Sequence, residues 1–394
     1  MVAAPSEGAA VGATEGEKKS GALAALMTSA LALPVLALPV RAGAAEVGEV
    51  GFTLLGYQER GLIKITEPIA WTRLRLGEDW EVRASALIDI ITGASPELVT
   101  NVTGQPVRTI TGASVSERRK AGDVKVTRRV RDFTFSASRA VSNEEDYHSR
   151  AFGLEATLDL DQKLTTLVAA FGKSNDRISS VDDELVGGRR DTKEYLAGLT
   201  RVLSPVALVQ STLQWSRGRG FFSDPYKKTF DFPPDGLPVL APDSRPDKRD
   251  MLAWLTRYRH HFPARHGTLQ AEYRYFRDDW GVRSHALEAA WEREVSERFA
   301  LRPALRYYTQ SQAFFYSPVL GTPRPELQSS DQRLSAFGGL SPSLRAIWRF
   351  ESGLAIEATA GYVYNDKGLR PGGGEKTFET LRAYFGIATL SKAF

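Results

Sequence analysis

The sequence predicts an all-β protein, an antiparallel transmembrane β-barrel, from three observations. Apolar and polar residues alternate in segments of about ten, as in Thr268–Tyr275, up to the final residue, Phe394. Short and longer connections between these segments alternate along the chain. The N-terminal residues have the composition of an export signal. Because successive strand side chains point to opposite faces, each segment offers an apolar face to lipid and a polar face to a lumen.

Composition excludes several classes of site. The chain has 394 residues and no cysteine, so a disulfide, a thiolate metal site and a CxxCH haem attachment are excluded. The formal net charge of +4 is small for this length and gives no indication of nucleic-acid binding. HExxH, GxSxG and GxGxxG motifs are absent, and we predict neither an enzyme nor a bound cofactor.

Residues 1–44 are predicted to be an N-terminal extension and a cleaved signal peptide. Lys18–Lys19 precede an apolar run over residues 22–40, and small residues follow, with cleavage expected after Ala44. A membrane anchor is the alternative, because about 18 apolar residues can span a bilayer. Two prolines within the run argue against an uninterrupted helix. Residues 45–394 are then a single barrel domain in the bacterial outer membrane.

About 16 strands are expected, or about 14 if boundaries are misplaced. The first lies near residues 47–57. Short periplasmic turns are expected near 77–79, 130–132, 159–163, 204–205, 263–266, 296–298 and 351–353. Mostly longer extracellular loops are expected near 93–120, 143–148, 174–190, 217–248, 278–282, 312–330 and 365–376. An even strand number places both termini in the periplasm.

The polar faces predict which charged residues line the lumen. Val82, Ala84 and Ile88 would face lipid in the segment that starts near Trp80. The candidate lumen or constriction residues are Asp89, Arg83, Glu155, Glu272, Arg274, Glu288 and Glu292. Asp89 could narrow the pore together with the following Gly- and Pro-containing turn. Alternatively, its side chain caps that turn.

The longest connection begins with aromatic residues. Its candidate plug or lid residues are Phe221, Phe222, Asp224 and Tyr226. A loop of about thirty residues usually has a function, either as a plug folded into the barrel or as a lid across its mouth. The sequence leaves both alternatives open.

Acidic residues gather on two extracellular connections and are candidate cation contacts: Glu144, Glu145, Asp146, Asp278 and Asp279. They lack the spacing of a defined calcium loop, so no metal site is predicted. The alternative is a solvated turn whose carboxylates pair with Arg150 and Arg277.

Several strings resemble an uncharacterised family of bacterial outer-membrane proteins known only as a domain of unknown function (DUF3570-like). They are Asp89–Pro96, Ser142–Tyr147, Arg257–Pro263, Tyr273–Gly281, Leu305–Ser311 and Phe315–Pro318. The resemblance implies a barrel and an outer-membrane location, with no established activity. Family members are often encoded near a flavin transferase and thioredoxin-like proteins, which implies a redox context.

The sequence is compatible with two functions. The first is a channel or specific pore for small polar or anionic solutes, because the inner face is rich in arginine and alternates in charge. The second is a non-conducting scaffold for a periplasmic redox or flavin-linked partner. Expected partners are outer-membrane lipid, lipopolysaccharide and the assembly machinery, with Phe394 as the assembly signal. The oligomeric state stays open.

Overall fold

The computed structural model describes residues 47–60, 63–93, 96–102, 105–110, 115–180, 185–231, 239–318 and 325–394. The predicted signal peptide lies outside these ranges. No helix in the described ranges is long and apolar enough to cross a membrane.

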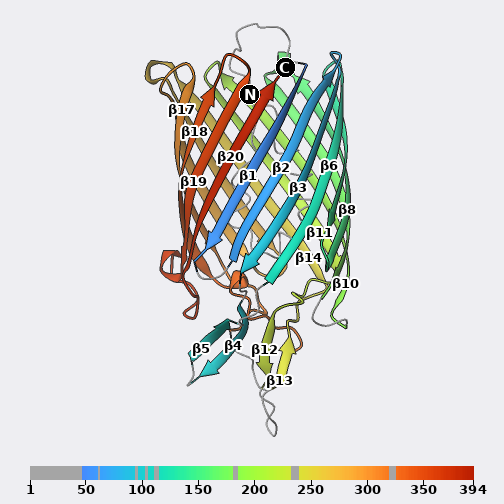
Figure 1. Ribbon diagram of the computed structural model, residues 1–394, viewed down its shortest axis with the longest axis vertical. Coiled ribbons are helices and arrows are strands. Elements are labelled where there is room, and N and C mark those ends of the chain that lie inside the picture. The colour runs from blue at the N-terminus through green and yellow to red at the C-terminus, as the bar shows by residue number, and fades with distance from the viewer. Residues whose placement is uncertain are drawn as a thin grey trace.

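Sixteen antiparallel strands close into a barrel, in which the last strand pairs with the first (Figure 1). The predicted fold class and strand number are therefore confirmed. The strands are β1 (Gly48–Glu59), β2 (Ile63–Leu76), β3 (Trp80–Gly93), β6 (Val115–Val130), β7 (Phe133–Asn143), β8 (Tyr147–Leu160), β9 (Thr165–Ser179), β10 (Gly187–Ser204), β11 (Ala207–Gly220), β14 (Lys248–Phe262), β15 (Gly267–Asp278), β16 (Arg283–Glu294), β17 (Phe299–Gln310), β18 (Phe337–Arg349), β19 (Leu354–Asp366) and β20 (Leu381–Ala393).

The seam of the barrel includes the C-terminal residue. The backbone N–H of Val47 donates to the carbonyl oxygen of Phe394 at 2.7 Å, and the N–H of Phe394 donates to that of Gly48 at 3.0 Å. The start of β1 and the end of β20 therefore share one end of the barrel (Figure 1). By the topology of such barrels this is the periplasmic end, and its tight turns include Gly77 and Gly353 at positive φ.

A small second sheet stands beyond the opposite, extracellular end of the barrel (Figure 1). It has the strand order β13-β12-β4-β5. Its strands are β4 (Pro96–Val102), β5 (Gln105–Ile110), β12 (Lys228–Asp231) and β13 (Val239–Pro242). Both regions were predicted to be loops. Short strands with a partner far away in the chain leave no long alternating pattern, and β12 pairs with β4 in parallel through only two residue pairs.

The two faces of the barrel wall differ as the alternation predicted. Large apolar side chains are exposed on the outer face, among them Leu154, Leu213 and Leu287. On the inner face Thr53 is buried and hydrogen-bonds to Thr389 at 3.0 Å. An exposed apolar band around a closed barrel fits contact with lipid hydrocarbon.

Candidate functional site

The strand register places all seven predicted lumen residues on the inner face of the barrel. Five of them form ion pairs: Asp89 with Arg119 at 3.3 Å, Arg83 with Glu81 at 2.6 Å, Glu155 with Lys125 at 3.1 Å, Glu272 with Arg257 at 2.6 Å, and Glu288 with Arg302 at 3.5 Å. Most of the predicted lumen charges are therefore neutralised by a partner on the same wall.

Arg119 on β6 joins two of the predicted sites. Its guanidinium lies 3.3 Å from Asp89, 3.4 Å from Glu67 and 3.7 Å from Glu144. Asp89 was predicted as a constriction charge and Glu144 as a loop cation contact, in separate parts of the chain. The structure brings both to one arginine that was not among the predicted site residues.

A cluster of arginines occupies the inner wall between β14 and β17. Arg259 lies close to Arg257 and Arg302, and Arg306 lies close to Arg274. Among the described residues, the guanidinium groups of Arg259, Arg274 and Arg306 make no ion pair, although three carboxylates contribute opposite charge nearby: Glu272, Glu288 and Glu292. Of these three, only Arg274 was predicted. The others occupy inner-face positions that strand parity alone would have found.

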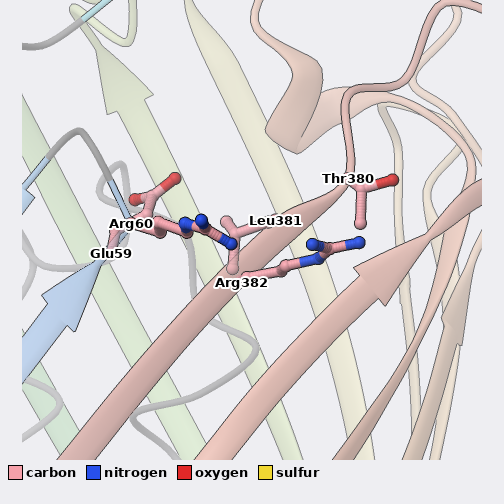
Figure 2. A pocket seen from close by; sticks show the side chains of 5 residues that line it. All are labelled: Glu59, Arg60, Thr380, Leu381 and Arg382. Carbon is pink, nitrogen blue, oxygen red and sulfur yellow. The ribbon is translucent and has the colours of Figure 1, made fainter.

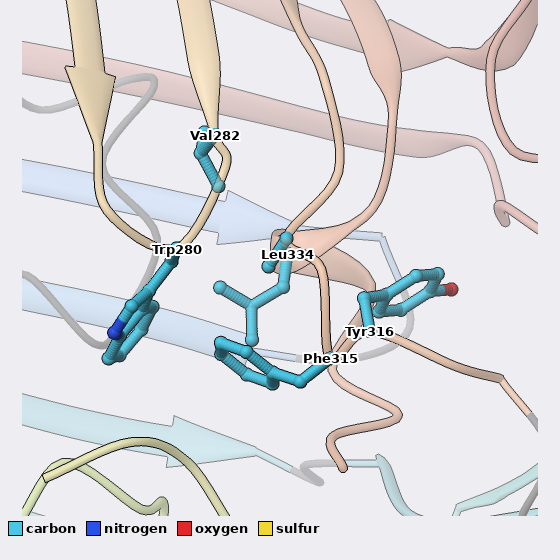
Figure 3. Close-up of a cluster of buried hydrophobic side chains, with 6 residues drawn as sticks. Trp280, Val282, Phe315, Tyr316 and Leu334 are labelled. Atoms are coloured by element: carbon cyan, nitrogen blue, oxygen red, sulfur yellow. The ribbon is translucent and has the colours of Figure 1, made fainter. Parts of the chain in front are cut away.

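An apolar cluster covers the extracellular end of this wall (Figure 3). Its buried members are Trp280, Val282, Ala313, Phe315, Tyr316 and Leu334. Phe276, on the inner face of β15, packs against them, as does Phe222 from the longest loop. Trp280 meets Phe222 edge-on at 5.6 Å and Phe315 at 5.1 Å between ring centroids. The loops at the mouth therefore share a packed core, which we call the cap.

Buried ion pairs complete the cap. Arg245 lies 2.6 Å from Asp243 and 3.0 Å from Asp331, and Arg333 lies 2.8 Å from Asp224. Arg333 also donates to Asp331 at 2.7 Å. These contacts tie the β11–β14 loop to the β17–β18 loop.

The cap shifts the pKa values of its carboxyl groups in opposite directions. Burial alone would raise the pKa of Asp331, but Arg333 and Arg245 outweigh it and hold that pKa well below its usual value. Burial raises the pKa of Asp243, and Arg245 offsets this only in part. Asp331 is thus the carboxylate that the two arginines stabilise most.

The predicted plug or lid residues all lie in the first part of the longest loop. The N–H of Phe221 donates to the carbonyl oxygen of Arg189 at 2.9 Å, and Arg190 lies over the ring of Phe222 at 5.3 Å. The hydroxyl of Tyr226 donates to Asp146 in the β7–β8 turn. This stem packs at the mouth, whereas β12 and β13 continue away from the barrel (Figure 1).

The acidic turns are paired mostly with groups other than those predicted. Asp278 binds Arg249 at 2.8 Å and accepts the N–H of Val282 at 2.8 Å, while Asp279 accepts the N–H of Asp250 at 3.0 Å. Glu145 is exposed. The arginine partners are thus Arg119 and Arg249, where Arg150 and Arg277 were expected. Within the described ranges, no group of three or more potential ligands is arranged to hold a metal ion.

A cavity of about 300 Å³ lies at the extracellular end of the β1–β20 seam (Figure 2). It is lined by Glu59, Arg60, Thr380, Leu381 and Arg382. The N–H of Arg60 donates to the carbonyl oxygen of Arg382 at 3.0 Å, so these contacts hold the seam closed beside the cavity.

A family model described as a protein of unknown function (DUF3570) matches residues 23–372. The chain belongs to this family. The predicted family resemblance is therefore confirmed. A search of the curated proteins finds no match.

Solved structures with a similar fold include CdiB from Acinetobacter baumannii, with a TM-score of 0.52, 8% identity and coverage of 89% of this chain and 61% of CdiB. For a bacterial polysaccharide outer membrane secretin the TM-score is 0.49 and the identity is 9%, and the match covers 89% of this chain and 100% of the secretin. For the siderophore receptor PirA from Pseudomonas aeruginosa the TM-score is 0.45 and the identity is 10%, and the match covers 88% of this chain and 62% of PirA. The DUF3570 chain thus has the fold of an outer-membrane β-barrel.

Proposed function

We propose that this protein is an outer-membrane channel for small anionic solutes. The observation that carries the proposal is the inner-wall cluster of Arg259, Arg274 and Arg306, which make no ion pair among the described residues. Cationic side chains that line a narrow passage favour anions and disfavour cations.

The cap adds selectivity by size. Its apolar cluster and buried ion pairs lie above the arginine wall and occupy part of the mouth. A rigid obstruction there suits a specific pore better than a wide, unselective one. Because the cap is anchored to inner-face residues such as Phe276 and Gln310, it narrows the entrance from within the rim.

The test is ion selectivity in planar bilayers. A variant with Arg259→Gln, Arg274→Gln and Arg306→Gln is compared with the wild type under a salt gradient. One unit charge at about 5 Å in water contributes about 0.8 kcal/mol, so each substitution should lower the permeability of the anion about fourfold and raise that of the cation about fourfold.

Arg298→Gln is the matched control, because Arg298 is an exposed arginine outside the lumen, paired with Glu351. It should keep the wild-type selectivity. A conducting wild type with no anion preference would contradict the proposal, as would unchanged selectivity in the triple variant. A correctly folded barrel that never conducts would instead favour the scaffold for a periplasmic partner.

A further inference from the structure

The outer face of strands β8–β11 carries a dense group of basic side chains near the extracellular end. We call it the outer cationic patch, and its members are Arg150, Lys173, Arg177, Arg189, Lys193 and Arg217. They occupy the same outward positions as the exposed apolar residues Phe152, Tyr195 and Leu213 farther down these strands. The four strands are neighbours in the barrel wall (Figure 1).

The register places three of these cations in one row across three strands. Lys173 on β9 is directly opposite Lys193 on β10, which is directly opposite Arg217 on β11. Farther out, Arg177 is directly opposite Arg189. Directly opposed side chains in a sheet have Cβ atoms about 5 Å apart, and like charges in this arrangement are destabilising.

Two carboxylates within the described protein offset part of this repulsion. Asp191 is exposed on the outer face of β10 between Arg189 and Lys193, where it accepts a hydrogen bond from Asn175, and Asp250 lies on the neighbouring strand β14. Arg217 pairs with Asp250 at 3.2 Å. Among the described residues, Arg150, Lys173, Arg177, Arg189 and Lys193 make no side-chain ion pair. The six cations outnumber these two carboxylates, so the patch keeps an excess of positive charge that an external anion can neutralise.

The next row inward fixes the depth of the patch. Phe171, Tyr195 and Trp215 lie on consecutive strands with ring centroids 5.3 Å apart at each step. Aromatic rows of this kind mark the membrane interface. Two residues along a strand span about 7 Å, which is about 5 Å of depth for a strand tilted by about 40°. The row of cations therefore lies outside the aromatic row, at the level of lipid headgroups.

We propose that the outer cationic patch binds the phosphate groups of a phosphorylated glycolipid in the outer leaflet of the membrane. Several phosphates on one headgroup could bridge neighbouring cations, and its acyl chains could lie along the apolar rows below. Clusters of basic side chains at a membrane surface recognise anionic headgroups in this way. The proposal concerns the lipid-facing surface and is independent of conduction through the lumen.

The experiment measures binding of bis-phosphorylated lipid A to the folded full-length barrel in detergent micelles. Lys173→Gln, Lys193→Gln and Arg217→Gln together should weaken binding about 100-fold, about fivefold for each cation. Arg201→Gln is the matched control, because Arg201 lies on the same face of β10 at the periplasmic end, paired with Asp161. It should bind as the wild type does.

Further arms identify the ligand and separate binding from folding. Lipid A without phosphates should not bind, and millimolar inorganic phosphate should not displace the intact lipid. Without lipid, the triple variant should unfold at the same or a higher temperature than the wild type, because it has lost repulsion between neighbouring cations. Equal lipid A binding by the triple variant, equal binding of the dephosphorylated lipid, or displacement by free phosphate would overturn the proposal.

Discussion

The two ends of the barrel carry the same chemical pair, an arginine with a carboxylate, in opposite surroundings. In the extracellular cap, the Arg245 and Asp331 side chains are 5% and 3% exposed and lie 3.0 Å apart. At the periplasmic end, the Arg298 and Glu351 side chains are 63% and 83% exposed. Removing one partner from a buried pair leaves an uncompensated buried charge, whereas the remaining partner of an exposed pair is hydrated by water.

This contrast indicates that different interactions fix the conformation of the connections at the two ends. The periplasmic turns are short connections whose geometry is set by the backbone, as at Gly77 and Gly353. The extracellular loops are held by side chains that meet from distant parts of the chain. The mouth is therefore the end at which a single substitution can change the shape of the entrance.

The largest effect is expected from Arg245→Ala. This variant leaves Asp243 and Asp331 buried without the guanidinium between them, which should destabilise the cap by about 3–5 kcal/mol. Because the chain has no cysteine, Ala313→Cys supplies a single reporter at a fully buried cap position. Its alkylation rate should rise strongly in the Arg245→Ala background.

The same reporter in the Arg298→Ala background is the control and should react as slowly as in the wild type. An alkylation rate unaffected by Arg245→Ala would show that the buried pair does not hold the cap together.

A somewhat smaller effect is expected from Trp280→Ala, which should destabilise the cap by about 3 kcal/mol. The substitution leaves a cavity where the indole ring was, and the surrounding loops can partly relax into it. Trp280 is 2% exposed, its indole N–H donates to the carbonyl oxygen of Lys248 at 2.8 Å, and Arg249 lies over its ring at 4.3 Å. Trp348→Ala, at an outward-facing position near the periplasmic end, should leave the cap unchanged. Limited proteolysis of the β17–β18 loop measures both, and equal protection of that loop in the two variants would refute the difference.

The barrel itself could be predicted from the sequence because its information is local. Alternation in Thr268–Tyr275 assigns each residue to a face without knowledge of its neighbours, and the inner positions of Glu272 and Arg274 follow directly. Turn positions were equally local, since short connections had to fall between the alternating segments.

The cap could not be predicted, because its contacts join residues that no pattern relates. Arg245 and Asp331 are 86 positions apart, and Arg333 and Asp224 are 109 apart. Phe222 was predicted as a plug or lid residue, but nothing in the sequence indicated that its ring packs on Trp280. Whether such a loop plugs, covers or lines the mouth depends on these distant partners.

Acid should loosen the extracellular end through Asp331. Its folded pKa is lowered, so it contributes stability that is present above its unfolded pKa of about 4 and is lost as the pH falls through the folded value. Asp243 acts in the opposite sense, because its raised pKa contributes stability at low pH that is lost as the pH rises.

Pepsin cleavage of the cap, corrected with an unstructured substrate, should therefore accelerate as the pH falls below about 4. Asp331→Asn should remove this acceleration and leave only the weaker, opposite dependence from Asp243. Acceleration that survives Asp331→Asn would assign the effect to other groups.

The smallest change in stability is expected at the periplasmic end, where the pair is again an arginine with a carboxylate but is exposed to solvent. Arg298→Ala should alter the free energy of unfolding by no more than about 0.5 kcal/mol, because an exposed pair gains little over hydration and ordering its side chains costs entropy. Unfolding in urea, followed by intrinsic fluorescence, measures the change. A loss comparable to that of Arg245→Ala would mean that burial does not distinguish the two ends, and the mouth would not be the end that is more sensitive to a single substitution.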